Sequence, residues 1–320
     1  MTPADLSLTV QHAVRRAVDD GALRVDVPPR VKVEKARPGG VGEYASSVAL
    51  SLARPAGRAA LDVASLLKER LEGADGILAV DITGPGFLNF TLRPGGGAGL
   101  LAAVSAAGLS YGHGDGLAGE TVRFEAGREE RASVVVGCLV GLVRAQGGDA
   151  GVADGGERVH VHPGTYDGET LGSDAARWRL LRAAPHDRPL DGAPLLLRHE
   201  RNGLFRVQYA HSRARRLLVN GRQLDVLPSY ETDVEDPLLG LVRDHPSVLL
   251  AAARHRAPDR VARHLEAVAD ALLGFQHTVL PLGDEKPSAA HRSRLVLAEA
   301  AGTVLAGGLS VLGISAPDRI

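Results

Sequence analysis

Cysteine, methionine and lysine are scarce in this sequence. Its 320 residues include one cysteine, one methionine and four lysines, so 33 of its 37 basic residues are arginines. Because Cys138 is alone, the sequence excludes an intramolecular disulfide and a zinc cluster built on cysteines. We therefore expect no cysteine-based metal centre.

The sequence also lacks an excess of charge of one sign and long apolar runs. The net charge is −1 at pH 7, so any binding to nucleic acid has to come from local basic patches. No apolar run reaches the length of a membrane span, and the N-terminus lacks a basic region followed by an apolar one. We expect a cytoplasmic protein without a membrane partner, with two or three domains in 320 residues.

Residues 205–220 predict an amphipathic helix with two distinct faces. The apolar stripe comprises Val207, Ala210, Ala214, Leu217 and Leu218. The opposite face carries Tyr209, Arg213, Arg216 and Asn220. An aromatic plane, two guanidinium groups and an amide are the groups that stack an unpaired base, bind its phosphates and read its edge. The alternative is a solvated helix face with an incidental tyrosine.

The first 94 residues predict a small α/β domain. Helices are expected over 3–19 and 59–72, a β-type stretch over 25–33, and strands over 77–82 and 87–92. A glycine-rich turn at 39–42 leads into a further helix. Its spacing fits neither a Walker A loop nor a dinucleotide fingerprint, so we favour a turn with a helix cap over a phosphate site.

The middle of the chain predicts a linker and then a short α/β segment. Residues 95–119 are rich in glycine and alanine, with a short helix expected near 100–107. The pattern then predicts a strand (121–125), a polar loop (126–131), a helix (132–146), a glycine-rich turn and a strand (158–161). His160 and His162 alternate on that last strand. Without a third ligand nearby, we favour surface histidines over a metal site.

Residues 201–320 are predicted to be mostly helical. The expected helices cover 205–220, 237–242, 247–255, 259–277 and 289–312. A basic cluster lies near the middle of this region and comprises Arg254, Arg256, Arg260 and Arg263. Asp259 is the only acid among them, so the cluster predicts phosphate contacts. The alternative is a solvated surface.

Several segments near both ends carry a family resemblance. Near the start, residues 42–45 (Gly-Glu-Tyr-Ala), 47–53 and 84–90 (Gly-Pro-Gly-Phe-Leu-Asn-Phe) resemble the N-terminal tRNA-contacting domain of arginyl-tRNA synthetases. In that family, a small α/β module meets the D-loop of tRNA. The resemblance implies that Phe87 and Asn89 contact an unpaired base there. The alternatives are that Phe87 is a buried core aromatic and that the Asn89 amide only forms hydrogen bonds within the turn.

Near the end, residues 207–213, 294–297 and the C-terminal residues 313–320 resemble the anticodon-binding helical bundle of the same family. In the family, this bundle and the last few positions pack on the opened anticodon. The resemblance implies that these contacts are made here by Tyr209, Arg213, Arg216 and Ile320. One departure is the Phe-Gln-His sequence at 275–277, where the family usually has a Phe-Tyr pair.

The catalytic signatures of the family are missing between these ends. Residues 121–146 resemble the first strand–loop–helix of a class I catalytic domain, but the loop reads Gly-Arg-Glu-Glu-Arg-Ala-Ser where the family has His-x-Gly-His. No Lys-Met-Ser-Lys loop is present, because no lysine lies between Lys68 and Lys286. Residues 171–181 resemble the segment that follows that loop. About 80 residues are too few for a complete nucleotide-binding domain.

We therefore expect a multidomain α+β protein. Its predicted parts are a small N-terminal α/β domain (1–94), a linker (95–119), a vestigial Rossmann-like class I catalytic remnant (120–200) and an all-α anticodon-binding bundle (201–320). The resemblance implies tRNA, specifically tRNA-Arg, as the partner. We expect no catalytic residue, cofactor, metal or DNA partner.

The leading hypothesis is a degenerate synthetase paralogue that binds tRNA and does not activate arginine by itself. One alternative is a tRNA-binding subunit or accessory of an arginine–tRNA ligase or another arginyl-tRNA-dependent enzyme, with a protein partner supplying catalysis. The other is a scaffold or regulatory protein that no longer binds RNA.

Overall fold

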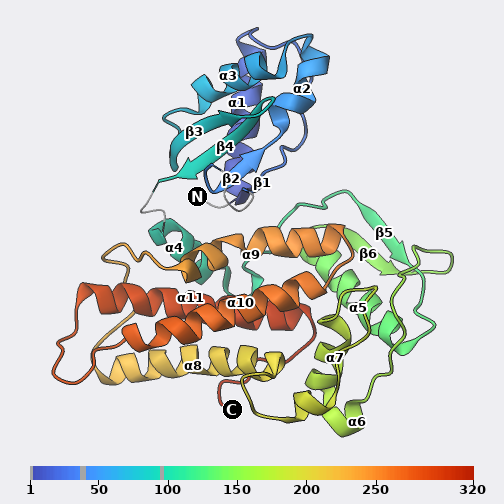
Figure 1. Cartoon of the computed structure of the whole chain (residues 1–320), viewed down its shortest axis with the longest axis vertical. Coiled ribbons are helices and arrows are strands. Elements are labelled where there is room, and N and C mark those ends of the chain that lie inside the picture. The colour runs from blue at the N-terminus through green and yellow to red at the C-terminus, as the bar shows by residue number, and fades with distance from the viewer. Residues whose placement is uncertain (1–2, 37–40, 94–96) are drawn as a thin grey trace. The chain divides into compact units, whose positions relative to one another are not determined.

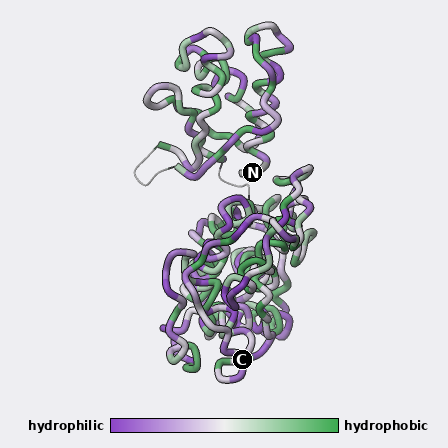
Figure 2. Tube along the Cα trace, turned by 90° about the vertical axis from the view of Figure 1, so that its right-hand side faces the viewer, coloured by the Kyte–Doolittle hydropathy of each residue, from purple (hydrophilic) through white to green (hydrophobic). Residues whose placement is uncertain are grey.

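The computed structural model of the chain describes residues 3–36, 41–93 and 97–320 (Figure 1). The chain divides into two compact units, Met1–Leu100 and Leu101–Ile320, and each is described by itself. Hydrophobic and hydrophilic residues are interspersed along the trace of both units (Figure 2), as expected where amphipathic elements surround a core. Gly39 and Gly40 of the predicted glycine-rich turn lie outside the described residues.

The first unit combines helices with an antiparallel sheet. Its described strands are β1 (Glu34–Lys35), β2 (Tyr44–Ser46), β3 (Ile77–Thr83) and β4 (Phe87–Leu92), in the order β1-β2-β4-β3. Its described helices are α1 (Pro3–Asp19), α2 (Val48–Ala56) and α3 (Ala60–Leu71). These bounds confirm the helices predicted over 3–19 and 59–72 and both strands of the predicted hairpin.

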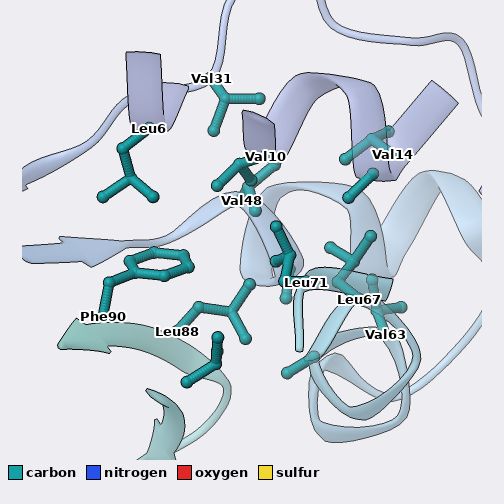
Figure 3. Close-up of a cluster of buried hydrophobic side chains, with 14 of the residues drawn as sticks. Leu6, Val10, Val14, Val31, Val48, Val63, Leu67, Leu71, Leu88 and Phe90 are labelled. Carbon is teal, nitrogen blue, oxygen red and sulfur yellow. The ribbon is translucent and has the colours of Figure 1, made fainter. Parts of the chain in front are cut away.

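One apolar core joins these helices to the sheet (Figure 3). Leu6, Val10 and Val14 follow one another at every fourth position of α1, and each is 0% exposed. They belong to one buried cluster with Leu67 of α3 and Phe90 of β4. Burying a side chain of this size stabilises the fold by about 1.5–3 kcal/mol. The helical spacing of apolar residues therefore accounts for how α1 packs.

The second unit begins with a small parallel α/β segment. Here β5 (Thr121–Phe124), α5 (Glu130–Ala145) and β6 (Asp149–Val152) form a strand–helix–strand unit, followed by α6 (Gly168–Leu171) and α7 (Ser173–Leu181). Helix α4 (Gly97–Ala107) spans the division between the two units. We call residues 120–200 the α5–α7 module. Its helices α5 and α7 contact each other, and α5 packs on the bundle that follows.

Four long helices form that bundle: α8 (Gly203–Gln223), α9 (Pro237–Arg254), α10 (Asp259–Phe275) and α11 (Ala289–Val311). Helix α11 packs on α8 and α10. Glycines permit this close approach, because a Cβ at Gly302 would lie 2.8 Å from the Ala214 Cβ, and one at Gly308 would lie 2.5 Å from Leu265 Cδ2. The helical bundle and the mixed α/β first unit confirm the predicted fold class.

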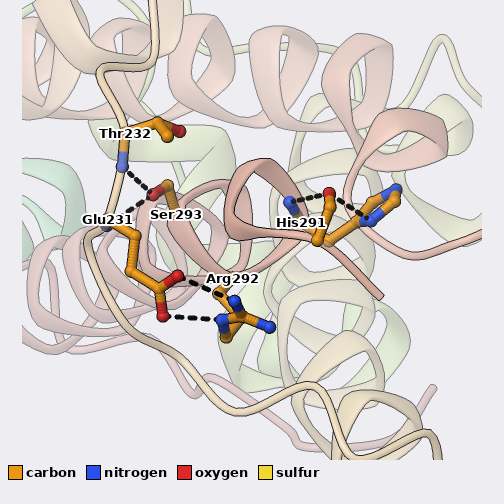
Figure 4. Close-up of polar contacts among 6 residues, drawn as sticks. Glu231, Thr232, His291, Arg292 and Ser293 are labelled. Atoms are coloured by element: carbon orange, nitrogen blue, oxygen red, sulfur yellow. Dashed lines mark hydrogen bonds and ion pairs between the residues drawn. The ribbon is translucent and has the colours of Figure 1, made fainter. Parts of the chain in front are cut away.

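The chain between α8 and α9 is fastened to the start of α11 (Figure 4). The Ser293 hydroxyl accepts the backbone N–H groups of Glu231 (2.8 Å) and Thr232 (2.9 Å). Arg292 donates two hydrogen bonds to the Glu231 carboxylate, at 2.6 and 2.8 Å. This guanidinium lowers the pKa of Glu231, so the carboxylate keeps its charge and the connection stays anchored.

Helix α11 is long and apolar enough to cross a membrane by length and composition, contrary to the expectation from the sequence. Its apolar window has a mean hydropathy of 1.4, and 61% of that window is buried inside the protein. A core helix shows both properties, because the neighbouring helices cover its apolar sides.

Three predicted elements are wrong in detail. No strand forms over 25–33, because Pro28 and Pro29 cannot donate to a strand ladder, and the strand begins only at Glu34. The partner of β5 is β6, within the predicted glycine-rich turn, whereas residues 158–161 form no strand. Helix α9 continues through Pro246, where two helices were expected. Burial of residues such as His245 and Leu249 on the same helix offsets the hydrogen bond that the proline removes.

Candidate nucleic-acid interface

Helix α8 presents the two faces that its sequence predicts. The five residues of the predicted apolar stripe are between 0% and 7% exposed. Asn202 caps the N-terminus by accepting the Phe205 N–H at 3.1 Å, which satisfies one of the free donors of the first turn. The same side chain donates to the carbonyls of Leu195 and Leu197, both at 2.9 Å. The helix is therefore fixed to the segment that precedes it.

The opposite face exposes an aromatic ring beside guanidinium groups. Tyr209 is 37% exposed, and its ring stacks on Phe205 with centroids 5.7 Å apart and planes 16° apart. Arg216 is exposed, whereas Arg213 is half-buried and donates from Nε to Gln276 Oε1 at 2.8 Å. Gln276 belongs to the segment that departs from the family pattern. This hydrogen bond therefore fixes the direction of the Arg213 side chain, which is one of the predicted contact residues.

The C-terminal residues 313–320, which we call the tail, run along α8. Gln208 donates to the Ser315 carbonyl at 3.0 Å, and His211 Nδ1 lies 3.1 Å from the Pro317 carbonyl. Further along, the Ser212 hydroxyl donates to the Asp318 carbonyl (3.0 Å), and Arg215 Nε donates to the Asp318 carboxylate (3.1 Å). Ile320, two residues beyond, is 42% exposed.

The predictions from sequence missed the stripe of α8 that holds this tail. Gln208, His211, Ser212 and Arg215 are spaced i, i+3, i+4 and i+7, which shows that they share one stripe of the helix but does not reveal the tail as its partner. His211 is only 5% exposed, and burial lowers its pKa. A carbonyl oxygen can only accept, so the ring donates from Nδ1 to the Pro317 carbonyl.

The β3–β4 hairpin separates the roles of its two predicted contact residues. Phe87 is 40% exposed at the start of β4, which excludes the core-aromatic alternative. Asn89 is 6% exposed, and its Nδ2 donates to Thr83 Oγ1 at 2.7 Å and to the Phe87 carbonyl at 3.3 Å. The Asn89 amide therefore forms hydrogen bonds within the hairpin, as the alternative interpretation of this residue predicts. The Phe87 ring remains exposed at the surface.

The predicted basic cluster does not form one free surface. Arg256 pairs with Glu157 at 2.9 Å and lies 5.3 Å above the centre of the Phe124 ring. Glu157 is a second acid that the sequence spacing did not reveal. Arg263 pairs with Asp259 at 3.2 Å. Arg254 and Arg260 are exposed, and Arg254 also donates to the Gly116 carbonyl at 3.2 Å.

The segment that would carry the first catalytic signature instead supplies a structural arginine. Arg131 is 0% exposed, and its guanidinium donates to five backbone carbonyls at 2.7–3.0 Å. The accepting residues are His162, Leu180, Ala183, Ala184 and Asp187. Three of these carbonyls lie at or just beyond the C-terminal end of α7, where unpaired carbonyls and the helix dipole favour a cation. Burial lowers the pKa of Arg131, and the charges of Asp187 and Asp259 oppose this shift.

A cavity of about 210 Å³ is lined by the loop between β5 and α5 and by residues 158–161. Among its charged lining residues, Glu125 pairs with both Arg158 (2.8 Å) and Arg128 (3.7 Å). The hydrogen bond from Arg158 lowers the pKa of Glu125, so this carboxylate stays ionised. Within the described residues, no three His, Cys, Asp or Glu side chains are grouped to hold a metal ion.

Two family models match the chain, one at each end. The model described as "Arginyl tRNA synthetase N terminal domain" matches residues 6–92, and "DALR anticodon binding domain" matches residues 207–320. The chain carries both terminal domains of the arginyl-tRNA synthetase family. The resemblance read from its sequence is thereby confirmed.

Curated relatives match part of the chain. An "Arginine--tRNA ligase" of Pseudarthrobacter chlorophenolicus is 40% identical over 165 residues, which cover 47% of this chain and 30% of the ligase. Another, of Frankia alni, is 48% identical over 125 residues, covering 39% of this chain and 23% of the ligase. The matched stretches thus cover less than a third of the length of these relatives.

Solved structures share the fold at low sequence identity. The arginyl-tRNA synthetase of Thermus thermophilus matches with a TM-score of 0.67 and 12% identity, with 100% of both chains covered. That of Plasmodium falciparum matches with a TM-score of 0.65 and 8% identity, with 99% of both chains covered. These matches support the arrangement of the elements described above.

Proposed function

We propose that the protein binds tRNA-Arg through its DALR domain and its N-terminal domain and does not activate arginine by itself. The observation that carries this proposal is the α8 face, where a half-exposed Tyr209 ring lies beside Arg213 and Arg216 on the matched anticodon-binding domain. An aromatic plane with neighbouring guanidinium groups suits an unstacked base and its phosphates. We propose a cytoplasmic location, where tRNA is used.

The α5–α7 module supports the absence of arginine activation. The loop after β5 contains no histidine, and the guanidinium of Arg131, in the first turn of α5, is engaged with five carbonyls of the module itself. The adjacent cavity is lined by two glutamates and two arginines, and Glu125 pairs with both Arg128 and Arg158. Because these guanidinium groups are engaged, the cavity lacks free cations to stabilise the charge that develops during adenylate formation.

The direct test is binding of tRNA-Arg and of an unrelated tRNA across a salt series. We expect selective binding to tRNA-Arg whose affinity falls with salt, because arginines release counterions from phosphates. Tyr209→Ala should weaken binding by about 1–3 kcal/mol at every salt concentration, the usual value of base–aromatic stacking. Tyr166→Ala is the matched control, because Tyr166 is also 37% exposed but lies in the α5–α7 module. Equal affinity for both tRNAs would contradict the proposal.

A second test addresses catalysis. Purified protein, free of host synthetase, should show no arginine-dependent exchange of pyrophosphate into ATP, with or without tRNA-Arg. An intact arginyl-tRNA synthetase run in parallel serves as the positive control. Exchange that follows the protein through successive purification steps would refute the catalytic part of the proposal without affecting the binding part.

The two matched tRNA-contacting domains, with no histidine in the loop between β5 and α5, favour one further candidate function. In it, the protein delivers tRNA-Arg to a partner that supplies the chemistry of an arginyl-tRNA-dependent reaction. Adding this protein to such a partner should raise the rate at limiting tRNA, and the Tyr209→Ala variant should raise it less. An unchanged rate would leave tRNA binding as the whole function.

A further inference from the structure

The tail begins just after α11, where the chain contacts helix α7 of the α5–α7 module. Arg177 of α7 donates from Nε to the Leu312 carbonyl at 3.1 Å. The next residue, Gly313, has φ = 70°, and a Cβ there would lie 2.6 Å from Arg177 Nη2. The left-handed turn that starts the tail therefore lies directly against the α7 guanidinium, and its positive φ favours glycine.

One turn earlier on α7, Asp174 joins three elements. Its Oδ1 accepts the Ser315 backbone N–H at 3.2 Å, and its Oδ2 accepts the Ser315 hydroxyl. The same Oδ2 accepts the side-chain amide of Gln208, on α8, at 3.0 Å. A carboxylate that accepts several hydrogen bonds holds its partners more firmly than neutral pairs do. Asp174 thus links α7, α8 and the tail at a single point.

Beyond this point the tail has little apolar packing. Ile314 is 4% exposed, but Ser315, Ala316 and Asp318 line a cleft of about 720 Å³ between the tail, α8 and α11. A segment bordering an open cleft gains little stability from burial, so its course depends on its polar contacts. Asp174 provides the first of these contacts along the chain.

We propose that Asp174 and Arg177 are positioning residues that hold the tail, and with it Ile320, along α8 beside its tRNA-binding face. The α5–α7 module then has a role of its own, as the platform that aims the tail. This inference rests on the proposed tRNA binding, and it can be tested separately from it.

The first readout uses the full chain without RNA. In hydrogen exchange, Asp174→Ala should speed exchange of the tail amides by about tenfold, because each lost hydrogen bond to a charged group is worth about that factor or more. Asp174→Asn keeps the shape and should have a smaller effect. The control is Asp191→Ala, an exposed aspartate of the same module that accepts the Ala193 N–H. Unchanged tail exchange in Asp174→Ala would overturn the inference.

The second readout is affinity for tRNA-Arg. Asp174→Ala should weaken binding by about fivefold to tenfold, and so should deletion of Ile320. The double variant should bind no more weakly than the Ile320 deletion alone, because both changes act through the tail. A merely structural role for Asp174 predicts losses that multiply, and this result would overturn the inference.

The failures of the two proposals are distinguishable. If wild-type protein shows no selectivity for tRNA-Arg, the proposed function fails, and tail exchange still decides whether Asp174 holds the tail. If wild-type protein binds selectively but Asp174→Ala frees the tail without weakening binding, the positioning role is overturned and the proposed function stands.

Discussion

At the scale of single residues, Arg131 connects several segments of the α5–α7 module. A buried guanidinium is costly unless its donors are used, and here it donates to five carbonyls. Four of those carbonyls belong to residues 180–187, so a single side chain orders the end of α7 and the turn that follows it. The planar, five-donor shape of arginine suits this task, whereas lysine offers only a point charge.

We predict that Arg131→Ala destabilises the second unit by about 3–5 kcal/mol, because it leaves several buried carbonyls unpaired. Arg131→Lys should cost less but still be destabilising. Trp178 is the chain's single tryptophan, lies on α7 and is 0% exposed, so its fluorescence during urea unfolding reports on this module.

The matched control for this prediction is Arg128→Ala, in the loop that precedes α5. The Arg128 side chain is 82% exposed, so its removal should change stability by no more than about 0.5 kcal/mol. Similar unfolding midpoints for the Arg128 and Arg131 variants would contradict the structural role of Arg131.

At the scale of elements, α9 and α10 meet through buried histidines. His245 of α9 is 0% exposed and stacks on His264 of α10, with ring centroids 5.3 Å apart. Within the described residues, neither ring nitrogen of His245 has a hydrogen-bond partner. Burial, and then the neighbouring histidines His264 and His113, lower its pKa well below the ordinary value. His245 is therefore neutral in the folded bundle.

This shift predicts that stability falls in mild acid. The unfolded chain takes up a proton on His245 below about pH 6.5, whereas the folded chain resists protonation until much lower pH. Stability is therefore full at neutral pH and declines as pH falls from 6.5. His245→Phe should flatten the decline between pH 7 and pH 5 in thermal unfolding, although His211, whose pKa is also lowered, adds a smaller decline of its own.

The same substitution at His255, an exposed residue that caps the end of α9, provides the control and should leave the pH dependence intact. A wild-type unfolding temperature that stays constant from pH 7 to pH 5 would contradict this account of His245.

The elements also show which parts of the structure a sequence can predict. Both faces of α8 followed from its periodicity, since each stripe is encoded within a few turns. Strand β6 could not be predicted in this way, because Asp149–Val152 is short and becomes a strand only by pairing with β5. The tail contacts join residues more than 100 positions apart, which local spacing does not encode. Likewise, nothing near Arg256 in sequence reveals its partner Glu157.

At the scale of the whole molecule, two units carry one proposed function. The chain supplies an exposed aromatic in each unit, Phe87 in the first and Tyr209 in the second. Net charge is −1, so attraction over the whole surface contributes little to binding. Affinity for one tRNA would then come from two separate contact regions, joined by the chain between them.

We predict that Phe87→Ala weakens tRNA-Arg binding by about 1–3 kcal/mol and that its effect adds to that of Tyr209→Ala within about 0.5 kcal/mol. Leu78→Ala is the control, because Leu78 is 56% exposed on the neighbouring strand β3. A loss well below 1 kcal/mol for Phe87→Ala would show that the hairpin makes no stacking contact, and the first unit would then need another role.

The Arg131 contacts also constrain how this chain can evolve. Arg131→His would remove the guanidinium that ties α5 to the end of α7. The cost in stability would come at once, whatever else the substitution gained. Any other substitution that relies on a fixed α7 would make that cost larger. Position 131 is therefore entrenched, and a change there would require rebuilding the module around it first.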